Sequence, residues 1–293
     1  DHRDLHSFPT RRSSDLAMGM TKSVFGKTSN GEVVHLVTVS NQKGMSIEVL
    51  DYGATLVSVN VPDKDGHTED VALGYDDVLD YEKGDAYLGA TVGRCGNRVD
   101  HAEFSINGKE YFMEKNEGEN VCHSGPRCYS RRMWDMELLE EENSVRFHLV
   151  SPNMDQGFPG TFEVTVTYTL TEENELKIHY HGTCDQDSMV NMTNHSYFNL
   201  HGQDSGKLVE DHLVWIDADN FTPVRDDLIP TGEIRPVEGT PLDFRTEKVL
   251  GKDICDPYEQ ITIGGGYDHN FVLNHYDGTF RKVARVKIGR AHV

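Results

Sequence analysis

The 293-residue sequence has little positive charge and few cysteines, and it lacks any long apolar run. Lys and Arg number 28 against 49 Asp and Glu, which gives a formal net charge of −21. Such a surface repels the phosphates of nucleic acids and anionic membranes. No apolar stretch approaches the ~20 residues that a membrane-spanning helix needs. The composition therefore favours a protein that acts on a neutral or cationic small molecule, with no nucleic-acid or membrane partner.

The five cysteines are scattered, odd in number and contain no Cys-x-x-Cys pair: Cys95, Cys122, Cys128, Cys184 and Cys255. This usage predicts reduced thiols and a cytoplasmic location. A serine-hydrolase elbow of the form Gly-x-Ser-x-Gly is also missing. His179 and His181 share one strand face, but no third metal ligand is evident, so we expect no metal and no cofactor.

Strand alternation dominates what is present. Residues 162–170 alternate apolar and polar side chains, and a polar turn at 171–174 leads into a second alternating run that begins at Leu176. This period of two is typical of a hairpin with one wet face. Helical signals are weak, with one short turn expected at 76–82. The pattern predicts an all-β protein, either a large antiparallel β-sandwich or a barrel.

Four polar clusters carry the candidate chemistry. They are Gly93-Arg94-Cys95-Gly96-Asn97-Arg98, His123-Ser124-Gly125, Asn194-His195-Ser196-Tyr197-Phe198-Asn199-Leu200 and Gly266-Tyr267-Asp268-His269-Asn270. A histidine titrates near neutrality and can move a proton. Asn and Arg side chains supply the donors that vicinal hydroxyls accept. Each cluster also has a plain structural interpretation, as a turn, an ion pair or a capping group, but together they predict a sugar site.

These clusters, in this order and spacing, resemble the aldose 1-epimerase (galactose mutarotase) family from about Met20 to Val286. Phe221-Thr222-Pro223 and Leu228-Ile229-Pro230-Thr231-Gly232 also match. The resemblance implies a β-sandwich of the galactose mutarotase type. It also implies cofactor-free interconversion of the α and β anomers of D-galactose or D-glucose within hexose metabolism.

The resemblance also assigns roles to individual residues. His195 would protonate the ring oxygen, and His123 would hold the sugar and polarise the same oxygen. Asn97 and Arg98 would bind hydroxyls, Asp268 would accept hydrogen bonds, and Ser196 and Tyr197 would line the pocket. The residues expected in the site are therefore the following: His195, His123, Asn97, Arg98, Ser196, Tyr197 and Asp268.

Both ends of the chain fit the body poorly. We expect residues 1–17 to be a non-native or disordered extension, 288–293 a non-native tail, and 18–287 a single mutarotase-like domain that is truncated at its C-terminus. The family's catalytic base is a glutamate in a later segment, preceded by a glutamine, and no residue here matches either one. Without that base the chain would bind sugar weakly and show little mutarotase activity. Full family-like acceleration, measured by polarimetry on freshly dissolved α-galactose, would contradict this expectation.

Two alternatives stay open at this stage. The first is a catalytically silent carbohydrate-binding fragment on the same scaffold. The second is an epimerase of hexose 6-phosphates, which would need basic residues in the cleft; Arg94, Arg98 and Arg127 leave this open. The sequence does not specify the oligomeric state or the choice between galactose and glucose.

Overall fold

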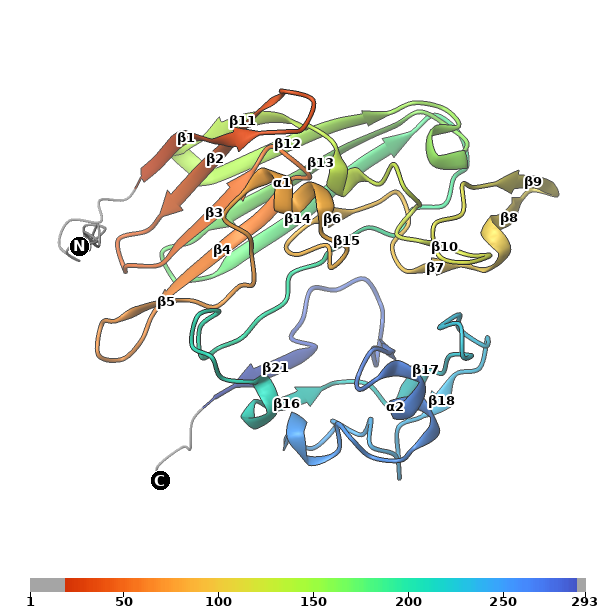
Figure 1. The fold of residues 1–293 in the computed structure, drawn as a ribbon. Helices are drawn as coiled ribbons and strands as arrows, with labels where there is room; N and C mark the ends of the chain where they lie inside the picture. The colour runs from red at the N-terminus through yellow and green to blue at the C-terminus, as the bar shows by residue number, and fades with distance from the viewer. Residues whose placement is uncertain (1–18, 289–293) are drawn as a thin grey trace, which may run out of the picture.

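The computed structural model describes residues 19–288 and is built almost entirely from antiparallel strands (Figure 1). The predicted N-terminal extension, and the tail apart from Ile288, lie outside the described residues. Within the described chain, a large β-sandwich forms one part and a smaller group of short strands forms the other. The candidate site residues come from both parts.

The first sheet of the sandwich consists of five consecutive strands, each antiparallel to the next. The short segment Asp51-Tyr52-Gly53 separates the third strand from the fourth. The hairpin succession follows directly from the short polar turns between the strands. The strands are β1 (Gly19–Lys27), β2 (Val33–Ser40), β3 (Ser46–Leu50), β4 (Thr55–Pro62) and β5 (Thr68–Asp70).

The second sheet has the order β11-β12-β13-β14. The alternation predicted a strand at 162–170, and β13 has these bounds, with its apolar side chains buried and the intervening ones more exposed. Among the described residues β14 pairs only with β13, so its other edge carries no strand. The strands are β11 (Asp135–Leu139), β12 (Ser144–Ser151), β13 (Phe162–Leu170) and β14 (Leu176–Cys184).

The two sheets pack face to face through one shared apolar core, so the expected sandwich is confirmed. Val37, Ile47 and Val49 from the first sheet and Phe147 and Val166 from the second are fully buried. Burying side chains of this size contributes roughly 1.5–3 kcal/mol each. This interface therefore fixes the register of both sheets and provides the rigid support for the loops above it.

Three two-stranded ladders lie beside the sandwich, two toward one end and the β6–β15 ladder near its middle (Figure 1). Asn97, Arg98, His123 and His195 lie in these ladders or directly next to them. In one of them the Asn107-Gly108 turn closes a tight hairpin, with both residues at positive φ. Type I′ turns require this conformation at both central positions. The ladder strands are β6 (Thr91–Val92), β7 (Arg98–Val99), β8 (Glu103–Ile106), β9 (Lys109–Phe112), β10 (Val121–Cys122) and β15 (Thr193–Asn194).

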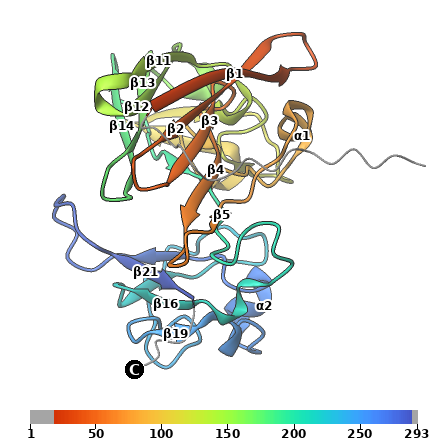
Figure 2. The ribbon, with the colours of Figure 1, turned by 90° about the vertical axis from the view of Figure 1, so that its left-hand side faces the viewer.

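The smaller part follows β15 and lies beside the sandwich (Figures 1 and 2). It has its own buried cluster of Phe221, Val237, Leu242 and Ile261. Residues 220–245 are mostly irregular and contain two short strands of this part. Its strands are β16 (Leu213–Ile216), β17 (Asn220–Thr222), β18 (Arg235–Pro236), β19 (Lys248–Val249), β20 (Asn270–Val272) and β21 (Ala284–Lys287).

Polar contacts join the two parts beside the candidate site. The Arg225 guanidinium contacts Asp100 at 2.8 Å, and the Asn120 amide donates to Asp227 at 3.2 Å. Whether residues 18–287 behave as one folding domain stays a prediction. The contacts nevertheless explain how a side chain from the smaller part can face the sandwich.

Helices are few and short. The α-helices are α1 (Val78–Lys83), where one turn was expected, and α2 (Glu259–Gly264), which the sequence did not predict. No helix among residues 19–288 has the length and apolar character needed to cross a membrane. The 3-10 turns are η1 (Asp100–Ala102), η2 (Tyr129–Arg131), η3 (Glu140–Glu142), η4 (Asp155–Gly157), η5 (Val209–Asp211) and η6 (Leu250–Lys252).

Candidate active site

A cavity of about 700 Å³ lies where the ladders meet the smaller part of the fold. Polar side chains from well-separated segments line it, which suits a small polar molecule. Of the predicted site residues, six line this cavity: Asn97, Arg98, His123, His195, Tyr197 and Asp268.

The Gly93–Arg98 segment divides its side chains between the cavity and the protein interior. Asn97 lies at the cavity with a φ of +61°, and its side-chain oxygen accepts a hydrogen bond from the Arg98 backbone at 2.8 Å. Arg94 is fully buried and donates to the carbonyls of Pro159 and Gly160. The alternative of a surface turn with arginines in ion pairs therefore does not describe Arg94, which is a structural residue of the interior.

His123 is fixed as a neutral donor by its neighbours. Its backbone donates to the Asn97 carbonyl at 2.9 Å, and its Nδ1 accepts the Asn97 backbone N–H at 3.0 Å. Because Nδ1 is an acceptor, the proton of the neutral ring sits on Nε2. Burial, and then the nearby His195 and Arg98, lower the pKa of His123 to about 4. At neutral pH this side chain can donate a hydrogen bond, but it is not an imidazolium.

The lowered pKa of His123 predicts that this residue makes the free energy of unfolding depend on pH. The unfolded chain takes up the proton near pH 6.5, whereas the folded chain takes it up only near pH 4. The contribution is thus complete above pH 6.5 and is lost as the pH falls towards 4, by about 2 kcal/mol at pH 5. Urea denaturation at pH 7.5 and 5 should show a smaller loss for His123→Asn than for the parent. Equal losses in the two proteins would contradict this assignment.

His195 is held by its backbone, which leaves its side chain at the cavity. Its N–H donates to the Ala90 carbonyl at 2.8 Å, and its carbonyl accepts from Gly89 at 3.2 Å. The imidazole lies 5.1 Å from the His123 ring and 5.1 Å from the Tyr197 ring, centre to centre. The two histidines of the sequence prediction therefore share one wall of the cavity.

Ser196 does not line the cavity, although the sequence placed it there. His195 and Tyr197 on either side both do. In extended backbone, successive side chains point to opposite sides, so the residue between two cavity-facing side chains turns away. The Ser196 hydroxyl oxygen is instead buried, and among residues 19–288 it has no hydrogen-bond partner. This part of the expected site is corrected.

Asp268 reaches the cavity from the smaller part of the fold. It lies just after α2, whose C-cap Gly265 adopts φ +65°, and just before β20. The segment after Gly264, Gly265 and Gly266 continues into a strand, β20, and not into a helix. Asp268 is exposed within the open cavity, where a carboxylate can accept two hydrogen bonds from neighbouring hydroxyls.

Arg98 is bound by an acid that the sequence did not single out. Its Nε and Nη2 contact the two carboxylate oxygens of Glu117 at 2.5 and 3.1 Å. Bidentate pairs of this kind fix the plane of the guanidinium. Arg127 lies at a different hollow, beside Phe112 and Met154. Of the three arginines considered for a phosphorylated sugar, Arg98 lines the cavity and Arg94 and Arg127 do not.

Several lining residues had no clear signal in the sequence. Glu117 lies shortly before His123 in a polar turn, a position that could have drawn attention to it. Tyr87 follows α1 in an irregular loop and gave no pattern at all. The other lining residues outside the four polar clusters are Asp85, Ala86, Asn116, Cys122, Asn191, Met192 and Thr193. Gly96 and Asn270 also line the cavity, and both belong to clusters that the sequence singled out.

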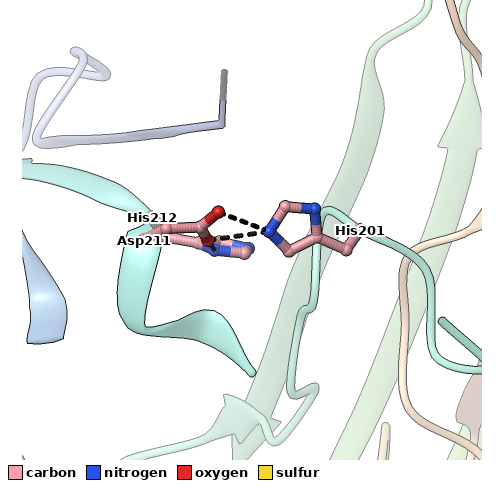
Figure 3. A group of neighbouring side chains, drawn as sticks. All are labelled: His201, Asp211 and His212. Atoms are coloured by element: carbon pink, nitrogen blue, oxygen red, sulfur yellow. Dashed lines mark hydrogen bonds and ion pairs between the residues drawn. The ribbon is translucent and has the colours of Figure 1, made fainter. Parts of the chain in front are cut away.

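A second polar cluster, His201, Asp211 and His212, lies outside the cavity (Figure 3). His201 Nε2 contacts the Asp211 carboxylate at 2.7 Å, and His212 Nδ1 contacts it at 3.2 Å. However, His212 Nε2 accepts the Leu200 backbone N–H at 2.9 Å. The His212 proton then sits on Nδ1, which has no lone pair to offer a metal ion. The cluster is a hydrogen-bond network that joins the loop after β15 to η5.

Comparison with known proteins gives one consistent result. The family model for aldose 1-epimerase matches residues 35–289. The galactose mutarotase of Sus scrofa is 40% identical over 258 residues, which cover 87% of this chain and 72% of that protein. The aldose 1-epimerase of Haemophilus influenzae is 40% identical over 245 residues, covering 84% and 70%.

Solved structures show the same similarity in three dimensions. The crystal structure of galactose 1-epimerase from Lactobacillus acidophilus superposes with a TM-score of 0.81 at 29% identity. The match covers 92% of this chain and 77% of that one. An aldose epimerase homologue from C. elegans gives a TM-score of 0.77 at 34% identity, covering 86% and 74%.

Proposed function

Because this chain belongs to the aldose 1-epimerase family, we propose that its cavity binds an aldohexose ring and that His195 is the acid that opens it. Family membership makes the protein an isomerase that interconverts the α and β anomers of a sugar. The observation that carries the assignment of the site is the single cavity that His123, His195 and Asp268 share. D-galactose and D-glucose are the proposed substrates.

The two histidines have different roles in opening the sugar ring. Opening a pyranose requires removal of a proton from the anomeric hydroxyl and delivery of one to the ring oxygen. No residue of this chain matches the family's base, so a solvent water in the open cavity takes the proton of the anomeric hydroxyl. His195 delivers the other proton to the ring oxygen, and the neutral His123 donates a hydrogen bond from Nε2 that polarises the same oxygen. The open aldehyde then rotates about one bond and closes on either face. Well-placed acid and base groups each contribute about 10²–10⁴-fold to such a rate.

Substrate hydroxyls are held by the polar groups around the histidines. Asn97 and Arg98 donate hydrogen bonds, and Asp268 accepts them. The Glu117 carboxylate keeps the Arg98 guanidinium in one plane, which fixes the direction of its donors. Holding the ring in one orientation turns the proton transfers into effectively unimolecular steps. Five cysteines without a disulfide support the further proposal that the protein works in the reducing cytoplasm.

Removal of the Asp268 carboxylate tests the binding role. We expect Asp268→Ala to weaken galactose binding by about 10-fold to 10²-fold, because hydrogen bonds to a charged group contribute roughly 1.5–3 kcal/mol. Titration of the sugar by calorimetry or NMR measures this change. Asp256→Ala, outside the cavity, is the matched control and should bind like the parent.

The same titration separates the candidate ligands. Galactose or glucose should bind more tightly than the corresponding 6-phosphate, because the basic residues expected of a phosphate site do not converge. Tighter binding of the phosphorylated sugar would favour the hexose 6-phosphate alternative. Asp268→Ala with parent-like affinity for every sugar would contradict the proposed binding site.

A further inference from the structure

Tyr87 lies at the cavity in a backbone conformation that its side chain disfavours. Its φ is +54°, in the left-handed region that bulky residues rarely adopt. Such a conformation costs free energy and persists only where the surroundings enforce it, most often at functional sites. The role of Tyr87 therefore lies in its contacts within the cavity.

The Tyr87 ring contacts both histidines of the site. Its centroid lies 4.7 Å from that of His123, at an interplanar angle of 71°, and 5.7 Å from that of His195, at 41°. The two imidazoles are themselves 5.1 Å apart at 85°. The three rings thus form a triangle in which each ring touches the other two, and all three line the cavity.

We propose that Tyr87 is a positioning residue of the epimerase site, whose ring sets the spacing and tilt of the His123 and His195 imidazoles and keeps water from His123. The inference rests on the proposed roles of the two histidines. Edge-to-face contacts between rings have preferred geometries, so a rigid third ring restricts how the other two rotate. Small misplacements of catalytic groups lower the rate by large factors. Correct placement of the two histidines would therefore offset the free-energy cost of the positive φ at Tyr87.

The aromatic ring of Tyr87 positions the two histidines, and its hydroxyl takes no part in this. Among residues 19–288 the Tyr87 hydroxyl has no hydrogen-bond partner, and burial raises its pKa to about 12, so it adds no charge beside the imidazoles. The charged and titratable groups that face His123 are His195, Arg98 and Glu117. Removal of the ring leaves all of these in place and admits water, so the pKa of His123 should rise from about 4 towards 6.5.

Two substitutions at one position separate ring from hydroxyl. Tyr87→Phe keeps the ring and should retain the parent kcat and the parent titration of His123. Tyr87→Asn removes the ring while tolerating the positive φ. We expect it to lower kcat by about 10-fold to 10²-fold with a smaller change in KM, and to raise the pKa of His123 measured by NMR. Tyr276→Asn, at a tyrosine 88% exposed, is the matched control and should change neither quantity.

A parent-like kcat and an unchanged His123 titration in Tyr87→Asn would overturn the proposal. If the Asn variant does not fold, Tyr87→Gly gives the same comparison, since glycine adopts positive φ freely. Failure of the proposed function has a different signature. In that case the parent chain neither binds galactose nor accelerates anomer exchange, while the His123 titration still reports whether Tyr87 controls that ring.

Discussion

Replacement of His195 by glutamine is expected to lower kcat/KM for anomer interconversion by about 10²–10⁴-fold relative to the unsubstituted chain. Glutamine preserves a hydrogen-bonding side chain at the cavity but cannot deliver a proton at neutral pH. Galactose binding should change much less, because Asn97, Arg98 and Asp268 stay in place. Polarimetry gives the rate at low activity if the protein concentration is raised, and NMR titration gives the affinity.

The control for this experiment is another histidine of the same chain. His179 is exposed on β14 and lies outside the cavity, so His179→Gln should leave the rate unchanged. A His195→Gln protein with parent-like kcat/KM would show that the acid is a different group. A variant that loses affinity and rate equally would show that His195 binds the sugar without protonating it.

The second large effect concerns stability. We expect Arg94→Met to lower the free energy of unfolding by about 3–5 kcal/mol, because several buried acceptors lose their donor at a cost of roughly 1–3 kcal/mol each. The Arg94 guanidinium is fully buried and donates to the Pro159, Gly160 and Ser151 carbonyls at 2.9–3.3 Å. Methionine fills part of the space but leaves these acceptors in the interior without a donor.

Urea denaturation followed by circular dichroism measures this loss. Arg146→Met is the matched control, because Arg146 forms an exposed ion pair with Glu137 and should contribute no more than ~1 kcal/mol. Arg94→Lys should also destabilise the protein, since a single ammonium cannot reproduce the planar fork of donors. An Arg94→Met protein within 1 kcal/mol of the parent would contradict the structural role assigned to this residue.

Local patterns were sufficient for the sandwich strands. Residues 162–170 form a strand because their period of two matches a sheet with one face in the core, and this holds whatever the partner strand is. The Asn107-Gly108 turn is equally local, since only certain residues accept positive φ at both positions. The helix at 259–264 escaped prediction because it is too short to show a helical period.

The candidate site could be predicted only in part. The motifs named His123, His195 and Asp268, but the same resemblance placed Ser196 in the pocket, and the sequence left open whether Arg94 lies in the cleft or in a surface turn. Strand alternation turns Ser196 away, and the interior behind Gly93 receives Arg94. Neither outcome can be derived from spacing along the chain, because each depends on which side of the backbone faces the cavity.

The sequence by itself determined the class of the fold, the family of the chain and the residue types available for proton transfer and sugar binding. Only the tertiary structure decided which of those residues meet. The wall formed by Tyr87, His123 and His195, the pairing of Arg98 with Glu117, and the approach of Asp268 all join segments far apart in the chain. Such contacts arise from the packing of sheets and loops, and no local propensity encodes them.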